Sequence, residues 1–404
     1  MRRIFDLAEV GAIPDGGCAR LALTDDDRAG RDLVVSWMTE LGLDVTIDKV
    51  GNVVGTWRVG SGASVMTGSH IDTVRTGGKY DGNLGVLAGL EVIQSMQESG
   101  FVPQRPIAVA FFTNEEGARF APDMLGSLVY VGGMSVEAAL ATTSIDGKNF
   151  GEELREIGYA GPVPCPGPTP HAFVELHIEQ GPVLEAEGIT IGCVDGVQGI
   201  SWSELVIDGQ SNHAGTTPMA LRHDPAYVAG RITVFLRELA TKMGPPQVCT
   251  VGKIDIHPNL INVVPARATM TIDVRNTDET LLRQAEADIA VFLERLEKDE
   301  GVTITKRPLA RFEPVVFDSR VIGLIDECAA EMDLSRKQMP SGAGHDAQML
   351  ARVCPTAMIF VPSVRGISHN PAEFTAEEDL IVGANLLLRV MHRLTDTEFL
   401  GSSS

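Results

Sequence analysis

The stretch Ser64-Val65-Met66-Thr67-Gly68-Ser69-His70-Ile71-Asp72 leads from a short apolar run directly to a histidine and an aspartate. A second such run spans 107–112, and runs of this kind are typical of strands buried on both faces of a parallel sheet. Functional groups of parallel sheets collect at the carboxyl ends of the strands. The stretch therefore predicts an α/β fold with a functional edge.

His70 and Asp72 are two positions apart in backbone that should still be extended, so both side chains leave on the same side. One of them can bind a metal ion while the other braces it. A metal-bound histidine usually donates its free ring N–H to an oxygen acceptor, so we expect the Asp72 carboxylate to fix the tautomer of His70.

Other metal-ligand side chains follow apolar runs or precede a helical pattern. These are Asp81, Glu115, Glu116, His177 and His369. A two-metal cluster needs a bridging carboxylate, and Asp81 is the natural candidate between its glycine-rich turns. The adjacent Glu115 and Glu116 cannot both point the same way, which suits one ligand and one general base. Taken singly, each such residue is more often a hydrogen-bonded structural group, but their number argues against coincidence.

Seven strings carry a resemblance to a known family. They are GSHIDT (68–73), GGKYDGNLGVLAGLE (77–91), TNEEGARF (113–120), ELHIEQGPVLE (175–185), SNHAGTTPM (211–219), LINVVPARATMTIDVRN (260–276) and SGAGHDA (341–347). Together they resemble the hydantoinase/carbamoylase branch of the zinc aminopeptidase and carboxypeptidase family, which includes N-carbamoyl-L-amino acid hydrolases, β-ureidopropionases and allantoate amidohydrolases. The resemblance runs in order from about residue 20 to about residue 390.

The resemblance implies two divalent metal ions per subunit. His70, Asp81 and His177 would hold one ion, and Asp81, Glu116 and His369 the other. Zinc, manganese, cobalt and nickel all accept imidazole and carboxylate ligands. The resemblance also makes Glu115 the general base, where a solvated loop carboxylate is the alternative.

His213 is implied to reach the metal site of a neighbouring subunit in a homodimer and to help hold the developing oxyanion; otherwise it is a turn histidine that caps backbone groups.

Candidate substrate contacts come from three places. Arg275 ends a strand on its polar face and could clamp a carboxylate bidentately, or it could be an ordinary sheet-face charge. The resemblance favours the clamp and adds Asn262 and Gln180. Gly344 and His345 belong to a glycine-rich turn before a helix, whose free N–H groups suit a carboxylate or ureido oxygen. A simple tight turn is the alternative.

The pattern between 199 and 313 changes to β-α-β-β-α-β, which predicts an inserted ferredoxin-like α+β domain. The resemblance implies lid and dimerisation roles for this domain. Residues 1–198 and 314–404 would form a discontinuous catalytic domain with a mostly parallel central sheet flanked by helices. The insertion explains why His369 lies so far from the other ligands in sequence. Alternation over 43–48 predicts an edge or antiparallel strand.

Composition excludes several classes of partner. The 404 residues include 33 Lys plus Arg against 54 Asp plus Glu, a formal charge of −21, which argues against nucleic acid or anionic membranes. No run approaches the length of a membrane span, and no apolar segment follows the basic start as in a signal peptide. Six scattered cysteines without a C-x-x-C pair predict reduced thiols in a cytoplasmic protein.

The leading hypothesis is hydrolysis of an N-carbamoyl amino acid, in which a hydroxide bridging the metal ions attacks the ureido carbonyl. The products would be the amino acid, ammonia and carbon dioxide. A β-ureidopropionase or allantoate amidohydrolase shares this chemistry, and one methylene contributes only about 1 to 3 kcal/mol of discrimination. A dipeptidase or N-acyl amino acid hydrolase is a further alternative. A non-catalytic scaffold should have lost a ligand or the base, and here all are present.

Overall fold

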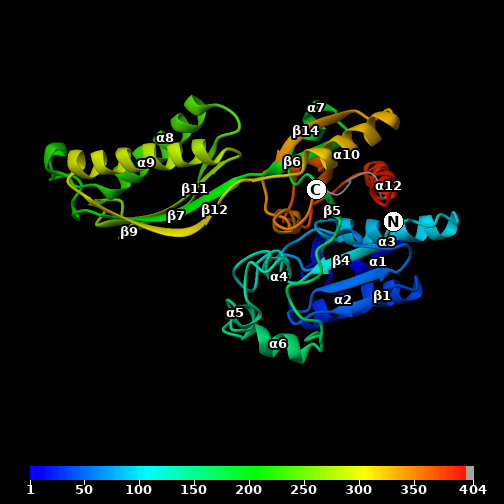
Figure 1. The fold of residues 1–404 in the computed structure, drawn as a ribbon. Coiled ribbons are helices and arrows are strands. Elements are labelled where there is room, and N and C mark those ends of the chain that lie inside the picture. The colour runs from blue at the N-terminus through cyan, green and yellow to red at the C-terminus, as the bar shows by residue number, and fades with distance from the viewer. Residues whose placement is uncertain (397–404) are drawn as a thin grey trace. The chain divides into compact units, whose positions relative to one another are not determined.

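The computed structural model describes residues 1–396. The chain divides into two compact units, unit 1 with residues 1–196 and from 316 onward, and unit 2 with residues 197–315. In Figure 1, unit 2 is coloured from green to yellow, and the blue, cyan, orange and red segments belong to unit 1. The predicted boundaries, 198/199 and 313/314, lie within two residues of these. Residues 397–404 of the predicted catalytic domain lie outside the described part of the chain.

A 9-stranded sheet forms the centre of unit 1, with the order β1-β2-β4-β3-β5-β15-β6-β13 and with β14 paired to β6. Its strands are β1 (Asp44–Ile47), β2 (Val53–Trp57), β3 (Val65–His70), β4 (Ile107–Phe112), β5 (Ala172–Ile178), β6 (Ile191–Val197), β13 (Val315–Val316), β14 (Arg336–Ser341) and β15 (Thr356–Val361). The central neighbours β4, β3, β5 and β15 pair in parallel. The pairs β1-β2, β2-β4 and β15-β6 are antiparallel. The predicted mostly parallel central sheet and the antiparallel strand over 43–48 are confirmed.

Every residue of β3, β4, β5 and β15 is buried. Because successive side chains of a strand point to opposite faces, both faces of the central sheet must be covered. The covering helices form two groups. In the first, α12 (Glu377–Leu394) contacts both α3 (Asn83–Glu98) and α10 (Ser319–Glu331); in the second, α11 (Asp346–Leu350) contacts α4 (Leu125–Tyr130). This explains the unbroken apolar runs in the sequence.

The helices of unit 1 are interspersed among its strands along the chain. They are α1 (Arg2–Ala8), α2 (Asp25–Glu40), α3 (Asn83–Glu98), α4 (Leu125–Tyr130), α5 (Val136–Leu140), α6 (Phe150–Glu156), α7 (Val183–Glu187), α10 (Ser319–Glu331), α11 (Asp346–Leu350) and α12 (Glu377–Leu394), with short 3₁₀ turns η1 (Pro14–Gly16) and η3 (Val364–Gly366). None of the described helices is long and apolar enough to span a membrane. All six cysteines are unpaired thiols.

The chain leaves unit 1 after β6 and returns through β13, and these two strands are hydrogen-bonded neighbours. The backbone N–H of Phe317 donates to the carbonyl of Asp195 at 2.9 Å. The two points where the insertion joins unit 1 are therefore adjacent in space.

Unit 2 follows the predicted β-α-β-β-α-β order. Its main elements are β7 (Gly199–Asp208), α8 (Pro225–Met243), β9 (Val248–His257), β11 (Arg267–Asn276), α9 (Glu279–Glu300) and β12 (Thr303–Phe312). The 4-stranded sheet has the order β12-β7-β11-β9 with antiparallel pairs. Apolar side chains of the sheet, including Leu205, Ile207 and Met270, pack against Ile232 of α8 and Ile289 of α9 to form its core. Beside the main sheet, η2 (Met219–Leu221) and the strand pair β8 (Asn212–His213) and β10 (Val263–Val264) complete the unit.

Candidate metal site

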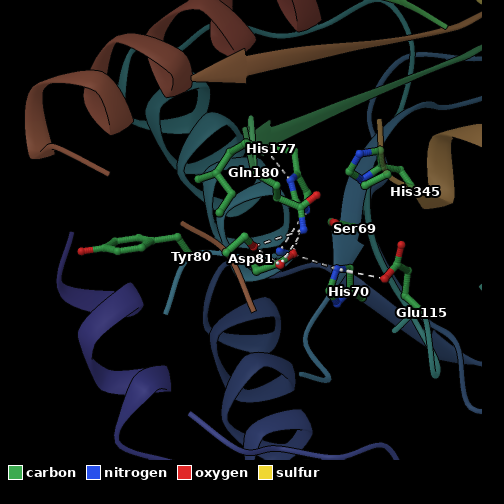
Figure 2. A network of polar contacts seen from close by, with 12 residues as sticks. Ser69, His70, Tyr80, Asp81, Glu115, His177, Gln180 and His345 are labelled. Carbon is green, nitrogen blue, oxygen red and sulfur yellow. Dashed lines mark hydrogen bonds and ion pairs between the residues drawn. The ribbon is translucent and has the colours of Figure 1, made fainter. Parts of the chain in front are cut away.

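Asp81 lies at the centre of a cluster of imidazoles and carboxylates in unit 1 (Figure 2). Its Oδ1 lies 3.1 Å from His177 Nε2 and 3.6 Å from His70 Nε2. Its Oδ2 faces the other way and lies 3.5 Å from His369 Nε2, which in turn lies 3.4 Å from Glu116 Oε2. One carboxylate therefore presents one oxygen to each of two histidine-containing groups.

The two groups contain the same residues as the two predicted ligand sets. Within each set, His70, Asp81 and His177 or Asp81, Glu116 and His369, the potential ligand atoms lie within 4.8 Å of one another. Imidazole and carboxylate donors at this spacing, all buried in the first set but with His369 exposed in the second, suit divalent cations of the zinc or manganese type. The donor chemistry therefore fits two metal ions that share Asp81.

Neighbouring parallel strands bring these residues together. His70 ends β3 and His177 lies near the end of β5, while Glu116 follows β4 and His369 follows β15. These strands stand side by side in the order β4-β3-β5-β15. Their carboxyl ends therefore meet at one edge of the sheet.

Gly82 allows the Asp81 segment to approach His70 closely. Its φ is 66°, and a Cβ at this position would come within 2.4 Å of the His70 ring. Gly82 also precedes α3, so Asp81 lies just before a helix N-terminus, where a negative charge is stabilised. A larger residue at Gly82 would displace either the histidine or the bridging carboxylate.

Backbone carbonyls orient the two buried histidines. The Nδ1 of His70 lies 2.8 Å from the carbonyl of Asp72, and the Nδ1 of His177 lies 2.8 Å from the carbonyl of Ile178. When each Nδ1–H donates to its carbonyl, the Nε2 lone pair of the neutral ring points at Asp81. Both rings are thus presented with the same nitrogen toward the ligand cluster.

The side chain of Asp72 has a different partner from the one we predicted. Its carboxylate accepts the backbone N–H groups of Glu115 and Glu116, at 3.2 and 3.3 Å, while its backbone oxygen contacts the ring of His70. The prediction that the carboxylate fixes the His70 tautomer was wrong, because the turn after β3 places the carbonyl closer to the ring. Asp72 instead connects the His70 strand end to the loop of the two glutamates.

The electrostatics of the cluster favour added positive charge. Burial raises the pKa values of Glu115 and Glu116 well above the usual range of a glutamate, and nearby carboxylates contribute to the rise. Burial alone would lower the pKa of His70, but Glu115 and Asp81 raise it well above its usual value. Buried carboxylates need compensation by protons or cations. Divalent ions would supply this compensation here.

Glu115 is buried beside the ligands, with its Oε2 3.3 Å from His70 Nε2. Figure 2 shows its carboxylate on the opposite side of His70 from Asp81. It is thus within reach of a group bound at the cluster, as a general base requires.

Gln180 lies against the bridging carboxylate. Its side-chain amide donates to Asp81 Oδ2 at 2.7 Å, while its Oε1 is buried without a hydrogen-bond partner among the described residues. The amide nitrogen therefore helps orient Asp81, and the oxygen is available for a further donor. Its predicted contact with substrate stays a prediction.

His345 lies beside the first ligand group, while the preceding Gly344 packs near Met124 and Gln348. The His345 ring is buried, packs against His177 with 4.6 Å between ring centroids, and shares a hydrogen bond with Ser341 at 2.8 Å. Burial lowers the pKa of His345 well below its usual value. In the helix that follows, the N–H of Ala347 donates to Glu175, so this donor is already used.

Glu175 and Arg20 are two buried residues whose positions the sequence reasoning missed. Glu175 forms a third possible ligand group with His177 and His345, and it accepts hydrogen bonds from Ser69 and Ala347. The i, i+2 spacing of Glu175 and His177 on one strand could have revealed it.

Arg20 is fully buried and connects segments that are distant in sequence. Its guanidinium donates to the carbonyls of Ile71 (2.8 Å) and Leu7 (2.9 Å) and to the Asn83 side chain (2.9 Å). It thus joins the turn after His70 to the start of α3, next to Asp81. No local sequence signal marks such a residue.

His213, Asn262 and Arg275 belong to unit 2. His213 is exposed, and its Nδ1 accepts the backbone N–H groups of Gly215 and Thr216 at 3.1 and 3.3 Å, so the Nε2 of the neutral ring carries the proton. The carbonyl of Asn262 accepts the N–H of Ala214 at 2.9 Å, which places the two predicted contact residues beside each other.

Arg275 lies at the opposite end of the unit 2 sheet. Its guanidinium pairs with Asp273 at 2.9 Å and lies 5.6 Å from the ring centroid of Trp202. Arg275 pairs with Ile200 at one end of β11, whereas Arg267 at the other end pairs with Asp208, near the His213 turn. Eight residue steps of about 3.3 Å separate these ends by roughly 26 Å.

Known proteins resemble this chain over most of its length. A family model described as Peptidase family M20/M25/M40 matches residues 66–393. The N-carbamoyl-L-amino acid amidohydrolase of Geobacillus stearothermophilus is 40% identical over 405 residues, which cover 98% of each chain. The allantoate amidohydrolase of Escherichia coli is 38% identical over 398 residues, 96% of this chain and 95% of that one.

Solved structures show the same likeness. A crystal structure of a hydantoinase/carbamoylase family amidase from Burkholderia multivorans matches with a TM-score of 0.95 and 45% identity, covering 98% of this chain and 96% of that one. The resemblance that the motifs indicated is thereby confirmed. The chain belongs to Peptidase family M20/M25/M40, in its hydantoinase/carbamoylase branch.

Proposed function

We propose that the protein is a metal-dependent amidohydrolase that cleaves the carbamoyl C–N bond of N-carbamoyl amino acids. One water is consumed, and the products are the free amino acid, ammonia and carbon dioxide. The observation that carries this proposal is the position of Asp81, which directs one oxygen to His70 and His177 and the other to His369. The named carbamoylase relatives support the choice of substrate class.

Two divalent cations, of zinc or of manganese, cobalt or nickel, would be held by the two ligand groups that share Asp81. When bound, they lower the pKa of a water molecule to about 7 and polarise the carbonyl that it attacks. Glu115 takes the proton from the attacking water and returns it to the departing nitrogen. Its burial suits this role, since a raised pKa brings a glutamate closer to neutral pH.

Unit 2 supplies the groups that bind the rest of the substrate. Arg275 clamps the carboxylate of the amino acid, and the Nε2–H of His213 with Asn262 contacts the carbonyl oxygen as it gains negative charge. A small substrate cannot contact both ends of β11, which lie roughly 26 Å apart. We therefore assign Arg275 to the subunit that holds the metal ions and His213 and Asn262 to the partner copy in a homodimer.

Mixed dimers test this shared site. Subunits carrying Glu115→Gln and subunits carrying His213→Ala are coexpressed with different affinity tags, and dimers with one copy of each are purified by both tags. Such a dimer holds one complete site and should recover about half of the wild-type turnover. A control dimer of His213→Ala with Asn262→Ala should recover none, because each site then lacks one group. Absence of recovery in the first dimer would contradict the shared site.

The substrate is tested by a panel of N-carbamoyl-α-amino acids, N-carbamoyl-β-alanine, allantoate and dipeptides with added manganese or zinc. Allantoate is a serious second candidate, because the allantoate amidohydrolase relative is nearly as similar as the carbamoylase. The peptidase family name keeps dipeptides and N-acyl amino acids in the panel. Ammonia release from carbamoyl substrates with none of the amine release expected from dipeptides would support the proposal. Turnover of none of the panel would favour a non-catalytic scaffold.

A further inference from the structure

Glu373 is a buried carboxylate that lies between two of the proposed ligand segments. Its Oε1 lies 3.2 Å from the backbone nitrogens of both Tyr80 and Asp81 and accepts their N–H groups. Its Oε2 accepts the hydroxyl of Ser368 at 3.0 Å. Glu373 is therefore bound to the backbone of the residue that would bridge the two cations.

The segment before Asp81 is shaped to receive this carboxylate. A Cβ on Gly78 would come within 2.1 Å of Glu373 Oε1 and 2.5 Å of its Cβ. Only a glycine leaves the space that the glutamate occupies. The chain at 78–81 thus wraps closely around the Glu373 side chain.

The same side chain is connected to the loop of His369. Ser368 precedes this histidine, and its hydroxyl lies 3.1 Å from Asp81 Oδ2, the oxygen that faces His369. Thr76 donates to the carbonyl of His369 at 3.4 Å. The N–H of Glu373 closes its own turn on the carbonyl of Asn370 at 2.9 Å. Two loops nearly three hundred positions apart in sequence are joined at one carboxylate.

We propose that Glu373 is a positioning residue that fixes the His369 loop against Asp81 and so determines the affinity of the second cation, the one assigned to Asp81, Glu116 and His369. The inference rests on the proposed two-cation site. His70 and His177, the other ligands of the first cation, are oriented by backbone carbonyls instead. His369 is about half exposed, with 52% of its side chain accessible, so it depends more on its loop for its position.

The test is calorimetric titration of metal-free protein with manganese or zinc, together with metal content after gel filtration. Glu373→Ala should leave one binding step unchanged and weaken the other by about tenfold or more, as expected for loss of a group that orients a ligand. Glu373→Gln keeps an oxygen that can accept the N–H groups of Tyr80 and Asp81, so the affinity of that step should fall less than in Glu373→Ala. Ser368→Ala removes the hydroxyl that contacts both Asp81 Oδ2 and Glu373 Oε2 but leaves the hydrogen bonds from Tyr80 and Asp81 to Glu373, so it should weaken that step less than Glu373→Ala does.

Asp48→Asn is the matched control. Asp48 is also a buried carboxylate with one oxygen that accepts two backbone N–H groups, from Val50 (2.9 Å) and Asn52 (3.0 Å), but its segment carries no proposed ligand. This variant should bind both cations as the wild type does. If Glu373→Ala does not fold, as judged by circular dichroism, Glu373→Gln and Ser368→Ala carry the test.

Wild-type affinities at both steps in all folded variants of Glu373 and Ser368 would overturn the inference while leaving the proposed function intact. A single binding step in the wild type would overturn the two-cation proposal and the inference with it. Equal weakening of both steps would also contradict the assignment to the second cation.

Discussion

The two units hold their candidate functional residues in opposite ways. In unit 1, the side chains of Asp81, His70 and Glu115 are buried and are fixed by contacts between segments far apart in sequence. In unit 2, His213 and Asn262 are exposed. His213 accepts hydrogen bonds within its own short turn, and the carbonyl of Asn262 accepts the N–H of Ala214 in that turn. Unit 1 thus confines charge in a preorganised site, whereas unit 2 presents donors at its surface.

Buried residues of unit 1 and exposed residues of unit 2 should therefore respond differently to substitution. A buried charged group is coupled to the stability of its surroundings, because neighbours lose their partners when it is removed. An exposed donor can be removed with little effect on folding, so any effect on rate reports its contact with substrate. Each experiment below separates rate or binding from stability.

The largest effect is expected for Glu115→Gln. Loss of the general base should reduce kcat by about a thousandfold, within the range known for such groups. Bound metal should remain, since Glu115 is not among the proposed ligands. Steady-state kinetics combined with metal analysis checks this. Loss of metal along with activity would indicate that Glu115 is a metal ligand, as proposed for Glu116, and would contradict its role as the general base.

Arg20→Met should give the largest loss of stability. The substitution leaves the carbonyls of Ile71 and Leu7 and the oxygen of Asn83 without their donor, at a cost of roughly 3 kcal/mol or more in unfolding free energy. Arg267→Met in unit 2 is the control, since its partner Asp208 is exposed and such pairs contribute less than about 1 kcal/mol. Urea denaturation of both variants measures the contrast. Equal stabilities would show that burial does not distinguish the two units.

His213→Ala should reduce kcat by about a hundredfold, as expected when one donor to a developing oxyanion is lost. The melting temperature and metal content should stay at wild-type values because the ring is exposed. His223→Ala serves as the control, since its Nδ1 shares a hydrogen bond with the carbonyl of Glu300 in the same unit at 2.9 Å and His223 is assigned no part in the site. This control should keep its activity. A normal kcat in His213→Ala would show that His213 does not act on the reaction and only caps backbone groups of its turn.

Arg275→Ala should give the smallest change, a rise in KM of about tenfold with kcat nearly unchanged, because a charge-assisted hydrogen bond to the substrate carboxylate is lost. Arg267→Ala at the other end of the same strand should leave KM unchanged. Initial rates over a range of substrate concentrations distinguish the two. If both variants behave alike, Arg275 is an ordinary charge on the sheet face, paired with Asp273.

The sequence predicted the central sheet and the gathering of ligands because both depend on short patterns. Apolar runs that end in His70 or His177 identify buried parallel strands and their functional edge. The role of the Asp72 carboxylate could not be predicted in this way, since the turn geometry decides whether the carboxylate or the carbonyl meets the ring. Arg20 and Glu373 have partners up to 293 positions away, a relation that no local pattern contains.

The junction between the units has a consequence for how this architecture can be altered. Because Asp195 and Phe317 are hydrogen-bonded across neighbouring strands, the ends left by removing the insertion already meet, and a short turn could reconnect them as a hairpin. The sheet of unit 1 would lose no strand from its centre. The insertion is in this sense a detachable module, and the edge that receives it is a natural place for grafting another domain of comparable footprint.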